Sequence, residues 1–265
     1  MADFTQKERY TQADLTEIMR ILRAPGGCPW DAEQTHESIK KNLIEETYEV
    51  VEAINRQDDI LLCEELGDLL MQVVFHAQMA QEAGAFTLED VADGVCKKLV
   101  ERHPHVFGDV VVANTDEVLS NWDKIKRSKK GQAAGSAPML GVPRELPALM
   151  RSTKVQQKAA AVGFDWPDAD GAMDKLREEL GELQEAMAAG DSAAAKEELG
   201  DLLFSAVNVS RFLHCDAEEA LTSACDKFIA RFVQVENLAK QTGLDMQSAT
   251  LAQLDELWEQ VKSSR

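Results

Sequence analysis

The chain has 265 residues, of which 45% are hydrophobic, and it carries a formal net charge of −19 at pH 7. That length gives room for two domains of ordinary size. The negative charge argues against nucleic acid and an anionic membrane surface as partners, because both repel an acidic protein. It leaves open nucleotides that arrive with a metal ion.

The five cysteines are odd in number, scattered, and never arranged as a Cys-x-x-Cys pair. This pattern is typical of reduced thiols in a cytosolic protein. The first residues lack the apolar core of a signal peptide, and no apolar run approaches the ~20 residues that a membrane span requires. We therefore expect a cytoplasmic protein with no membrane partner.

Apolar residues at helical spacing predict four helices in the first half, over residues 11–22, 36–55, 58–83 and 88–102. Pro104 ends the fourth of these, because proline removes a backbone donor and clashes with the preceding turn. Residues 110–113 are the only strand-like run, and they are too short and isolated to build a sheet. A short helix over about residues 116–129 carries Trp122.

Residues 128–147 are rich in glycine, proline, alanine and lysine, which predicts an interdomain linker between domains at 1–127 and 148–265. Helices are then expected over residues 148–161, 172–189, 192–213, 217–242 and 251–262. The same interval separates Trp30 from Trp122 and Trp166 from Trp258. The predicted fold is therefore all-α and internally repeated.

Two glutamate-rich segments carry the repeat most clearly. Each opens with two adjacent glutamates and a third three residues on, and each closes on the string Glu-Glu-Leu-Gly-Asp. The members are Glu45, Glu46, Glu49 and residues 64–68 in the first copy, and Glu178, Glu179, Glu182 and residues 197–201 in the second. The interval from the first copy to the second is constant, so one unit has been used twice.

A helical hairpin would bring the acids of each copy together. Residues three apart share a helix face, and the acids lie mirror-wise about position 57 in the first copy and about Gly190 in the second. A short turn at these centres makes the helices antiparallel neighbours. The carboxylates that then meet are Glu46, Glu49, Glu65 and Asp68, and Glu179, Glu182, Glu198 and Asp201.

Four like charges between packed helices need protons or cations. Oxygen ligands without histidine or cysteine suit Mg²⁺ or Mn²⁺ better than zinc. The alternative is a solvated acidic face, which is common in acidic chains. The recurrence of the same mirror spacing favours the metal site.

A lysine and an arginine four residues apart follow each hairpin, as Lys98 with Arg102 and as Lys227 with Arg231. That spacing places both cations on one helix face, as phosphate oxygens would require. Ordinary surface charge pairing is the alternative, and recurrence leaves the two interpretations evenly matched.

Trp122 and Trp258 lie on short helices and are either core residues or aromatic surfaces for a base. Metal-binding acids, two cations and an aromatic face are the parts that hold a nucleoside triphosphate. No P-loop or Gly-x-Gly-x-x-Gly string is present in the sequence.

With these residues in view, the chain resembles the MazG nucleoside triphosphate pyrophosphohydrolases, whose signature is Glu-Glu-x-x-Glu followed by Glu-x-x-Asp. Both copies carry it. The flanking strings extend the likeness over nearly the whole chain: Cys-Pro-Trp-Asp at 28–31, Glu-Arg-His-Pro-His-Val-Phe-Gly at 101–108 and Val-Gly-Phe-Asp-Trp at 162–166. The resemblance implies two tandem helical-bundle domains, an intertwined homodimer, and hydrolysis of nucleoside triphosphates, with deoxynucleotides included, to the monophosphate and pyrophosphate.

The resemblance also implies roles for individual residues, and it implies that the second copy is the catalytic one. It implies Mg²⁺, replaceable by Mn²⁺, on Glu179, Glu182, Glu198 and Asp201, with Glu46, Glu49, Glu65 and Asp68 as the less certain set. The nucleotide would be surrounded by Lys175, Glu178, Glu197, Lys227, Arg231 and Trp258, with Lys98, Arg102 and Trp122 as first-copy counterparts. Glu178 is the candidate proton acceptor, by its position outside the metal set.

Two other functions stay open at this point. One is a related all-α pyrophosphatase with a narrow substrate, such as dUTP, a phosphoribosyl nucleotide or an alarmone. The other is a non-catalytic helical dimer that binds a protein through its acidic faces. The intact acids of both copies argue against the second, since a scaffold has no need of the mirror spacing.

Overall fold

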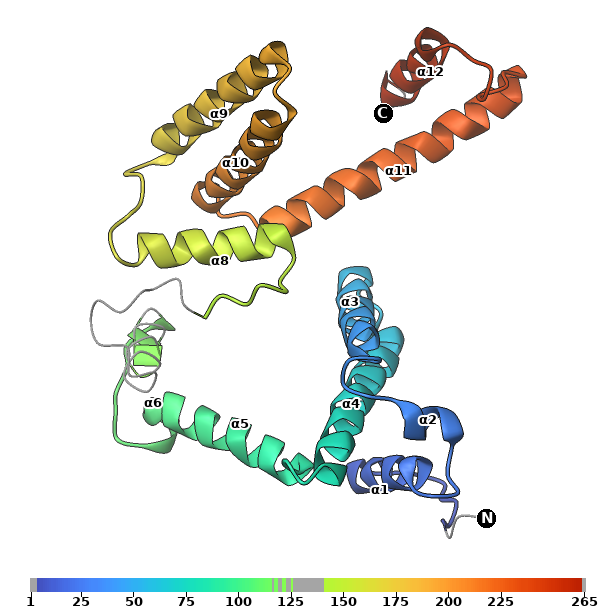
Figure 1. Ribbon diagram of the computed structural model, residues 1–265, viewed down its shortest axis with the longest axis vertical. Helices are drawn as coiled ribbons and strands as arrows, with labels where there is room; N and C mark the ends of the chain where they lie inside the picture. The colour runs from blue at the N-terminus through green and yellow to red at the C-terminus, as the bar shows by residue number, and fades with distance from the viewer. Residues whose placement is uncertain (1–3, 116, 119–120, 123–124, 126–140, 264–265) are drawn as a thin grey trace. The chain divides into compact units, whose positions relative to one another are not determined.

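The computed structural model describes residues 4–115, 117–118, 121–122, 125 and 141–263, and the chain divides into two compact units, Met1–Gln132 and Ala133–Arg265 (Figure 1). Residues 128–140 of the expected linker lie outside the described residues, so its bounds stay a prediction. Most of the helix expected over residues 116–129 lies outside them too. Among the described helices, none combines the length and apolar character needed to cross a membrane.

The described part of the first unit contains only helices. They are α1 (Gln12–Arg23), α2 (Pro29–Glu33), α3 (Lys40–Arg56), α4 (Asp59–Glu82), α5 (Leu88–Arg102) and α6 (Pro104–Phe107). Residues 110–113, which looked strand-like, form no strand. The buried core of this unit lies between α1 and α4 and contains Met19, Ile39, Val74, Phe75 and Met79.

The second unit is likewise helical throughout its described residues. Its elements are α8 (Ala148–Ala160), α9 (Ala169–Ala189), α10 (Ser192–Phe212), α11 (Ala217–Thr242) and α12 (Leu251–Ser263). A small core of Val235, Ala239, Leu257 and Val261 joins α11 to α12. The tandem all-α fold expected from the sequence is therefore confirmed.

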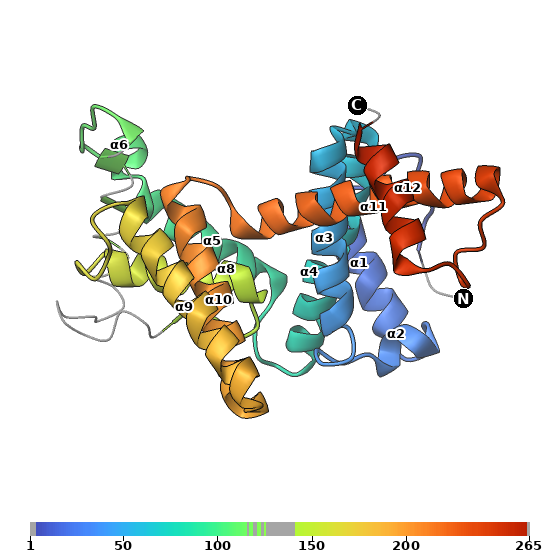
Figure 2. The same ribbon diagram turned by 90° about the horizontal axis from the view of Figure 1, so that it is seen from above.

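Each unit contains one antiparallel helical hairpin, α3 with α4 and α9 with α10, and the paired helices lie side by side in both views (Figures 1 and 2). The two turns are built alike. Gln57 and Gly190, the mirror centres of the acidic pattern, both adopt the left-handed conformation, with φ of 54° and 72°. Asp58 and Asp191 then cap the next helix by accepting hydrogen bonds from its first backbone N–H groups.

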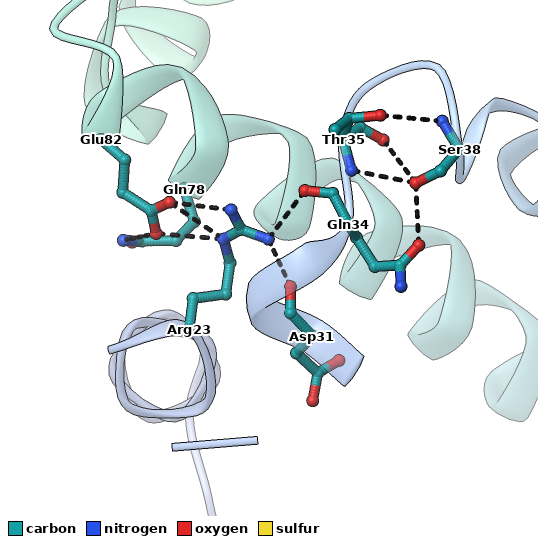
Figure 3. Close-up of polar contacts among 7 residues, drawn as sticks. All are labelled: Arg23, Asp31, Gln34, Thr35, Ser38, Gln78 and Glu82. Atoms are coloured by element: carbon teal, nitrogen blue, oxygen red, sulfur yellow. Dashed lines mark hydrogen bonds and ion pairs between the residues drawn. The ribbon is translucent and has the colours of Figure 1, made fainter. Parts of the chain in front are cut away.

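Two helix starts differ from those expected. Helix α3 begins at Lys40 rather than at residue 36, because Thr35 and Ser38 form a turn in which each side chain accepts a hydrogen bond from the other's backbone N–H (Figure 3). Helix α9 begins earlier than expected, at Ala169, because the side chain of Asp168 accepts from the N–H groups of Asp170 and Gly171.

Arg23 links the segment between α1 and α3 to helix α4 through hydrogen bonds. The guanidinium of Arg23 donates to Glu82 on α4, with Nη2 to Oε2 at 2.8 Å, and to the backbone oxygens of Asp31 and Gln34 (Figure 3). Gln78 donates to the same carboxylate at 2.9 Å. The Arg23 side chain is 7% exposed, so these charge-assisted bonds are poorly screened and contribute more than a surface ion pair.

Candidate metal and nucleotide site

The α9–α10 hairpin gathers three of the four acids predicted for the second copy. Carboxylate oxygens of Glu179 and Glu182 on α9 and of Glu198 on α10 all lie within 4.8 Å of one another. Asp201 is not a member of this group, although its charge raises the pKa of Glu198. Because α9 and α10 are antiparallel, residues at equal distances from the turn lie beside each other, and the mirror spacing therefore brings the acids of the two helices together.

The α3–α4 hairpin gathers the equivalent acids. Oxygens of Glu46, Glu49 and Glu65 meet the same 4.8 Å limit, and Asp68 again stands outside the group. Three carboxylates so close, with only oxygen donors, form a set that fits a hard divalent cation. Each hairpin thus offers one such set.

Burial, together with repulsion between neighbouring acids, raises the pKa of two members of the cluster in the second unit. Burial raises the pKa of Glu182, Lys175 partly offsets this, and Glu179 adds to the rise. Burial raises the pKa of Glu198 as well, followed by repulsion from Glu179 and Asp201. These causes disfavour the charged carboxylates unless a cation is present.

In the first unit, burial again raises the pKa of Glu46, followed by its hydrogen bond with Glu49 and repulsion from Asp68. Burial, followed by repulsion from Glu49, also raises the pKa of Glu65. In both clusters, therefore, burial and repulsion between the acids raise the pKa of carboxyl groups.

Lys175 is placed among the acids of the second unit. Its Nζ lies 2.8 Å from Oε1 of Glu178 and 2.8 Å from Oε1 of Glu179. These contacts raise the pKa of Lys175 well above its usual range. Glu178, the candidate proton acceptor, thus stands beside the cluster and outside the metal-binding group.

Gln72, a buried glutamine at the first cluster, was not among the site residues predicted from the sequence. Its Nε2 donates to Oε1 of Glu46 at 3.4 Å, and its own Oε1 is buried without a partner among the described residues. Its position in the sequence could have indicated this role, because Gln72 follows Asp68 by four residues on α4 and therefore lies on the same face of the helix as Asp68. The second copy has the buried Ser205 at the equivalent place.

The predicted basic and aromatic residues lie on α11 and α12. Trp258 is partly buried against the small core there, and its ring centroid is 5.1 Å from that of Phe228, a contact that the sequence analysis missed. Lys227 is exposed and Arg231 is half-buried. Within the described residues of the second unit, no hydrogen bond or ion pair joins either cation to an acid. Within the second unit α11 packs against α8, α10 and α12 and not against α9, which carries Glu179 and Glu182, so one chain does not bring the two cations to these acids.

The first-copy counterparts are arranged differently. Trp122 meets the ring of His103 edge-on, with centroids 5.0 Å apart, and His103 directly follows the end of α5. Arg102 is the last residue of α5, and Lys98 lies one turn earlier. Glu197, the remaining predicted residue, adds to the raised pKa of its neighbour Glu198.

Glu182→Gln is expected to raise the melting temperature of the metal-free protein at neutral pH. The pKa of Glu182 is raised in the folded state above its ordinary value of 4.5, so the folded state binds this proton more tightly than the unfolded state. The stability contributed by the group is then present at acid pH and lost as pH rises through the folded pKa. Glutamine removes that loss at neutral pH.

The measurement is calorimetry in chelator at pH 7 and pH 5, repeated with Mg²⁺ and a non-hydrolysable triphosphate analogue. The difference between variant and wild type should shrink toward pH 5, and Mg²⁺ with the analogue should stabilise the wild type more than the variant. A variant that melts below the wild type at pH 7 in chelator would contradict the repulsion between these acids.

An all-α chain with two helical hairpins, each presenting a cluster of three carboxylates, falls in the class of helical proteins that can hold a divalent cation between paired helices. The profile of the MazG nucleotide pyrophosphohydrolase domain matches residues 34–107 and 169–236. These stretches include all eight predicted acids. The chain belongs to this family, and the resemblance found in the sequence is confirmed.

Several relatives are similar over most of the chain. A Thermotoga maritima protein named nucleoside triphosphate pyrophosphohydrolase/pyrophosphatase MazG is 48% identical over 94% of both chains. An Escherichia coli K12 nucleoside triphosphate pyrophosphohydrolase is 47% identical over 94% of this chain and 95% of its own. The uncharacterized protein YabN of Bacillus subtilis is 46% identical over 93% of this chain and 50% of its own.

Proposed function

We propose that this protein hydrolyses nucleoside triphosphates, ribo- and deoxyribonucleotides alike, to the monophosphate and pyrophosphate, with Mg²⁺ held in the second unit. The observation that carries the proposal is the cluster of Glu179, Glu182 and Glu198, in a family whose relatives bear that activity in their names. Asp201 completes the proposed metal set, and Mn²⁺ substitutes for Mg²⁺. Free nucleotides, and not nucleic acid or a membrane, are the proposed partners.

The bound ion would neutralise charge on the phosphates and lower the pKa of a bound water. Glu178 would accept the proton of the attacking water on a carboxylate oxygen. Lys175 holds Oε1 of Glu178 at 2.8 Å, which fixes the carboxylate and leaves its other oxygen for the proton. Glu197, next to the cluster on α10, would contact the nucleotide.

Lys227 and Arg231 would bind phosphate oxygens, and Trp258 would contact the base. Since one chain does not bring them to its acids, we place them there through an intertwined homodimer. Large apolar side chains are exposed on the hairpin and on α11, as an interface requires: Leu180, Met187, Leu199, Leu203 and Phe204, and Leu221, Phe228, Ile229, Phe232 and Val233.

The first unit would carry a second metal set on Glu46, Glu49, Glu65 and Asp68, with Lys98, Arg102 and Trp122 as its nucleotide-binding residues. We propose domains at 1–127 and 148–265 joined by a linker. A cytoplasmic enzyme of this kind would control or clean the nucleotide pool.

The test is product analysis after incubation with each ribo- and deoxyribonucleoside triphosphate and Mg²⁺ in ¹⁸O-labelled water. We expect monophosphate and pyrophosphate, with the label in the monophosphate because water attacks the α-phosphorus. Excess chelator should remove the activity, because the acids cannot hold a triphosphate without a cation.

Diphosphate with orthophosphate as products would contradict the proposed bond choice, and full activity in chelator would contradict the metal. Turnover confined to dUTP, a phosphoribosyl nucleotide or an alarmone would instead identify a narrow-substrate pyrophosphatase. Absence of turnover with every substrate would favour a binding role.

A further inference from the structure

The two acidic clusters differ in one charge. Lys175 lies four residues before Glu179 on α9, and the equivalent residue on α3, four before Glu46, is Asn42. The rest of the acidic pattern is identical in the two copies. The second cluster thus carries a resident cation that the first one lacks.

Lys175 occupies an oxygen that a metal ion would need. Its Nζ contacts Oε1 of Glu179 at 2.8 Å, and the Glu179 side chain is only 7% exposed. An ion pair with such a buried partner is weakly screened, and an ammonium group repels a divalent cation beside it. A metal that binds this oxygen alone must therefore displace Lys175 from Glu179, and Lys175 then keeps only its contact with the more exposed Glu178.

A triphosphate changes this balance. Lys175 is 36% exposed in its side chain, so it can turn from Glu179 to phosphate oxygens that arrive with the metal. The ammonium then neutralises the phosphate charge, and Glu179 becomes free for the ion. Metal and nucleotide would enter the second cluster together.

The first cluster has a neutral side chain beside it, Gln72, that can supply a further oxygen ligand. Gln72 is 6% exposed, donates to Glu46 at 3.4 Å, and has a buried side-chain oxygen without a partner among the described residues. Rotation of the amide by half a turn presents that oxygen to the cluster, and amide oxygens are good ligands for hard cations. No positive charge opposes an ion at this position, since Asn42 is neutral.

We propose that the first cluster binds a divalent cation by itself, whereas the second takes up its cation only with a triphosphate, with Lys175 as the residue that imposes this order. The inference rests on the proposed function for the ligand that draws Lys175 away from Glu179. Its first half, cation uptake without nucleotide, is independent of catalysis.

The experiment counts Mn²⁺ bound by the full chain from the paramagnetic resonance of the free ion. Without nucleotide we expect one tight Mn²⁺ per chain, removed by Glu49→Gln. With a triphosphate analogue that has a methylene group between the α- and β-phosphorus atoms, we expect a second Mn²⁺, removed by Glu182→Gln. Two equal sites without nucleotide, or none, would overturn the proposal.

Reciprocal substitution isolates the responsible residue. Lys175→Asn should add a nucleotide-independent Mn²⁺ at the second cluster and tighten it by about tenfold or more, as loss of one adjacent charge predicts. Asn42→Lys should weaken the first site by a similar factor. Circular dichroism checks that both variants stay helical. Unchanged Mn²⁺ binding in both folded variants would rule out the lysine as the cause, whatever the outcome of product analysis with triphosphates.

Discussion

Glu182→Ala or Asp201→Ala is expected to lower triphosphate hydrolysis by at least about 100-fold, whereas Glu49→Ala or Asp68→Ala should leave most of it. Loss of a metal ligand displaces the ion, and a displacement of ~1 Å can cost ~100-fold in rate. The steady-state rate of pyrophosphate release measures the effect. Glu185→Ala, an exposed acid on α9 outside the cluster, serves as the matched control.

The asymmetry between the copies has a structural basis. In the first unit α5 stops at Arg102, two residues before Pro104, whereas α11 continues past Arg231 to Thr242. Val235 and Ala239, further along α11, pack in a core with α12, so Lys227 and Arg231 stand on a better supported helix. Inactive first-copy variants beside active second-copy ones would show that the active site lies in the other half.

Ile229→Asp is expected to convert the proposed dimer to a monomer and to remove its activity. Ile229 is 59% exposed on α11, among the apolar side chains that we assign to the interface. A carboxylate buried there without a partner would cost several kcal/mol. Activity should fall too, because in the proposed arrangement Lys227 and Arg231 would reach the acids only through the dimer.

Light scattering coupled to size exclusion measures the mass, and Ser223→Asp adds the same charge at an exposed polar position of α11. That control should stay dimeric. An active wild-type monomer, or a dimeric and fully active Ile229→Asp variant, would contradict the assigned interface.

The sequence predicted the helices best where start and stop signals are strong. Helix α5 begins directly after Thr87, which forms a capping box with Asp90 in the first turn, and ends before Pro104, and its bounds agree with the expected range. Helix α2 was missed because five residues are too few to show a period. The late start of α3 was missed because it depends on mutual hydrogen bonds between Thr35 and Ser38.

The candidate site was predictable to the extent that it depends on local geometry. Mirror spacing about Gly190 was enough to bring Glu179, Glu182 and Glu198 together, because one turn and one helical period fix their positions. The partnership of Lys175 with Glu179 depends on side-chain conformation, which periodicity does not reveal. The position of Lys227 depends on how whole helices pack, and a pattern along one helix carries no such information.

The compact hairpin has a consequence for the order of folding. The acids of the second cluster lie between Glu179 and Asp201, on two helices joined at Gly190. Contacts so close in sequence close a short loop, and such contacts form early and fast. During synthesis the acids meet as soon as α10 has left the ribosome, before α11 and α12 have emerged, so this hairpin forms independently of the helix that carries Lys227 and Arg231.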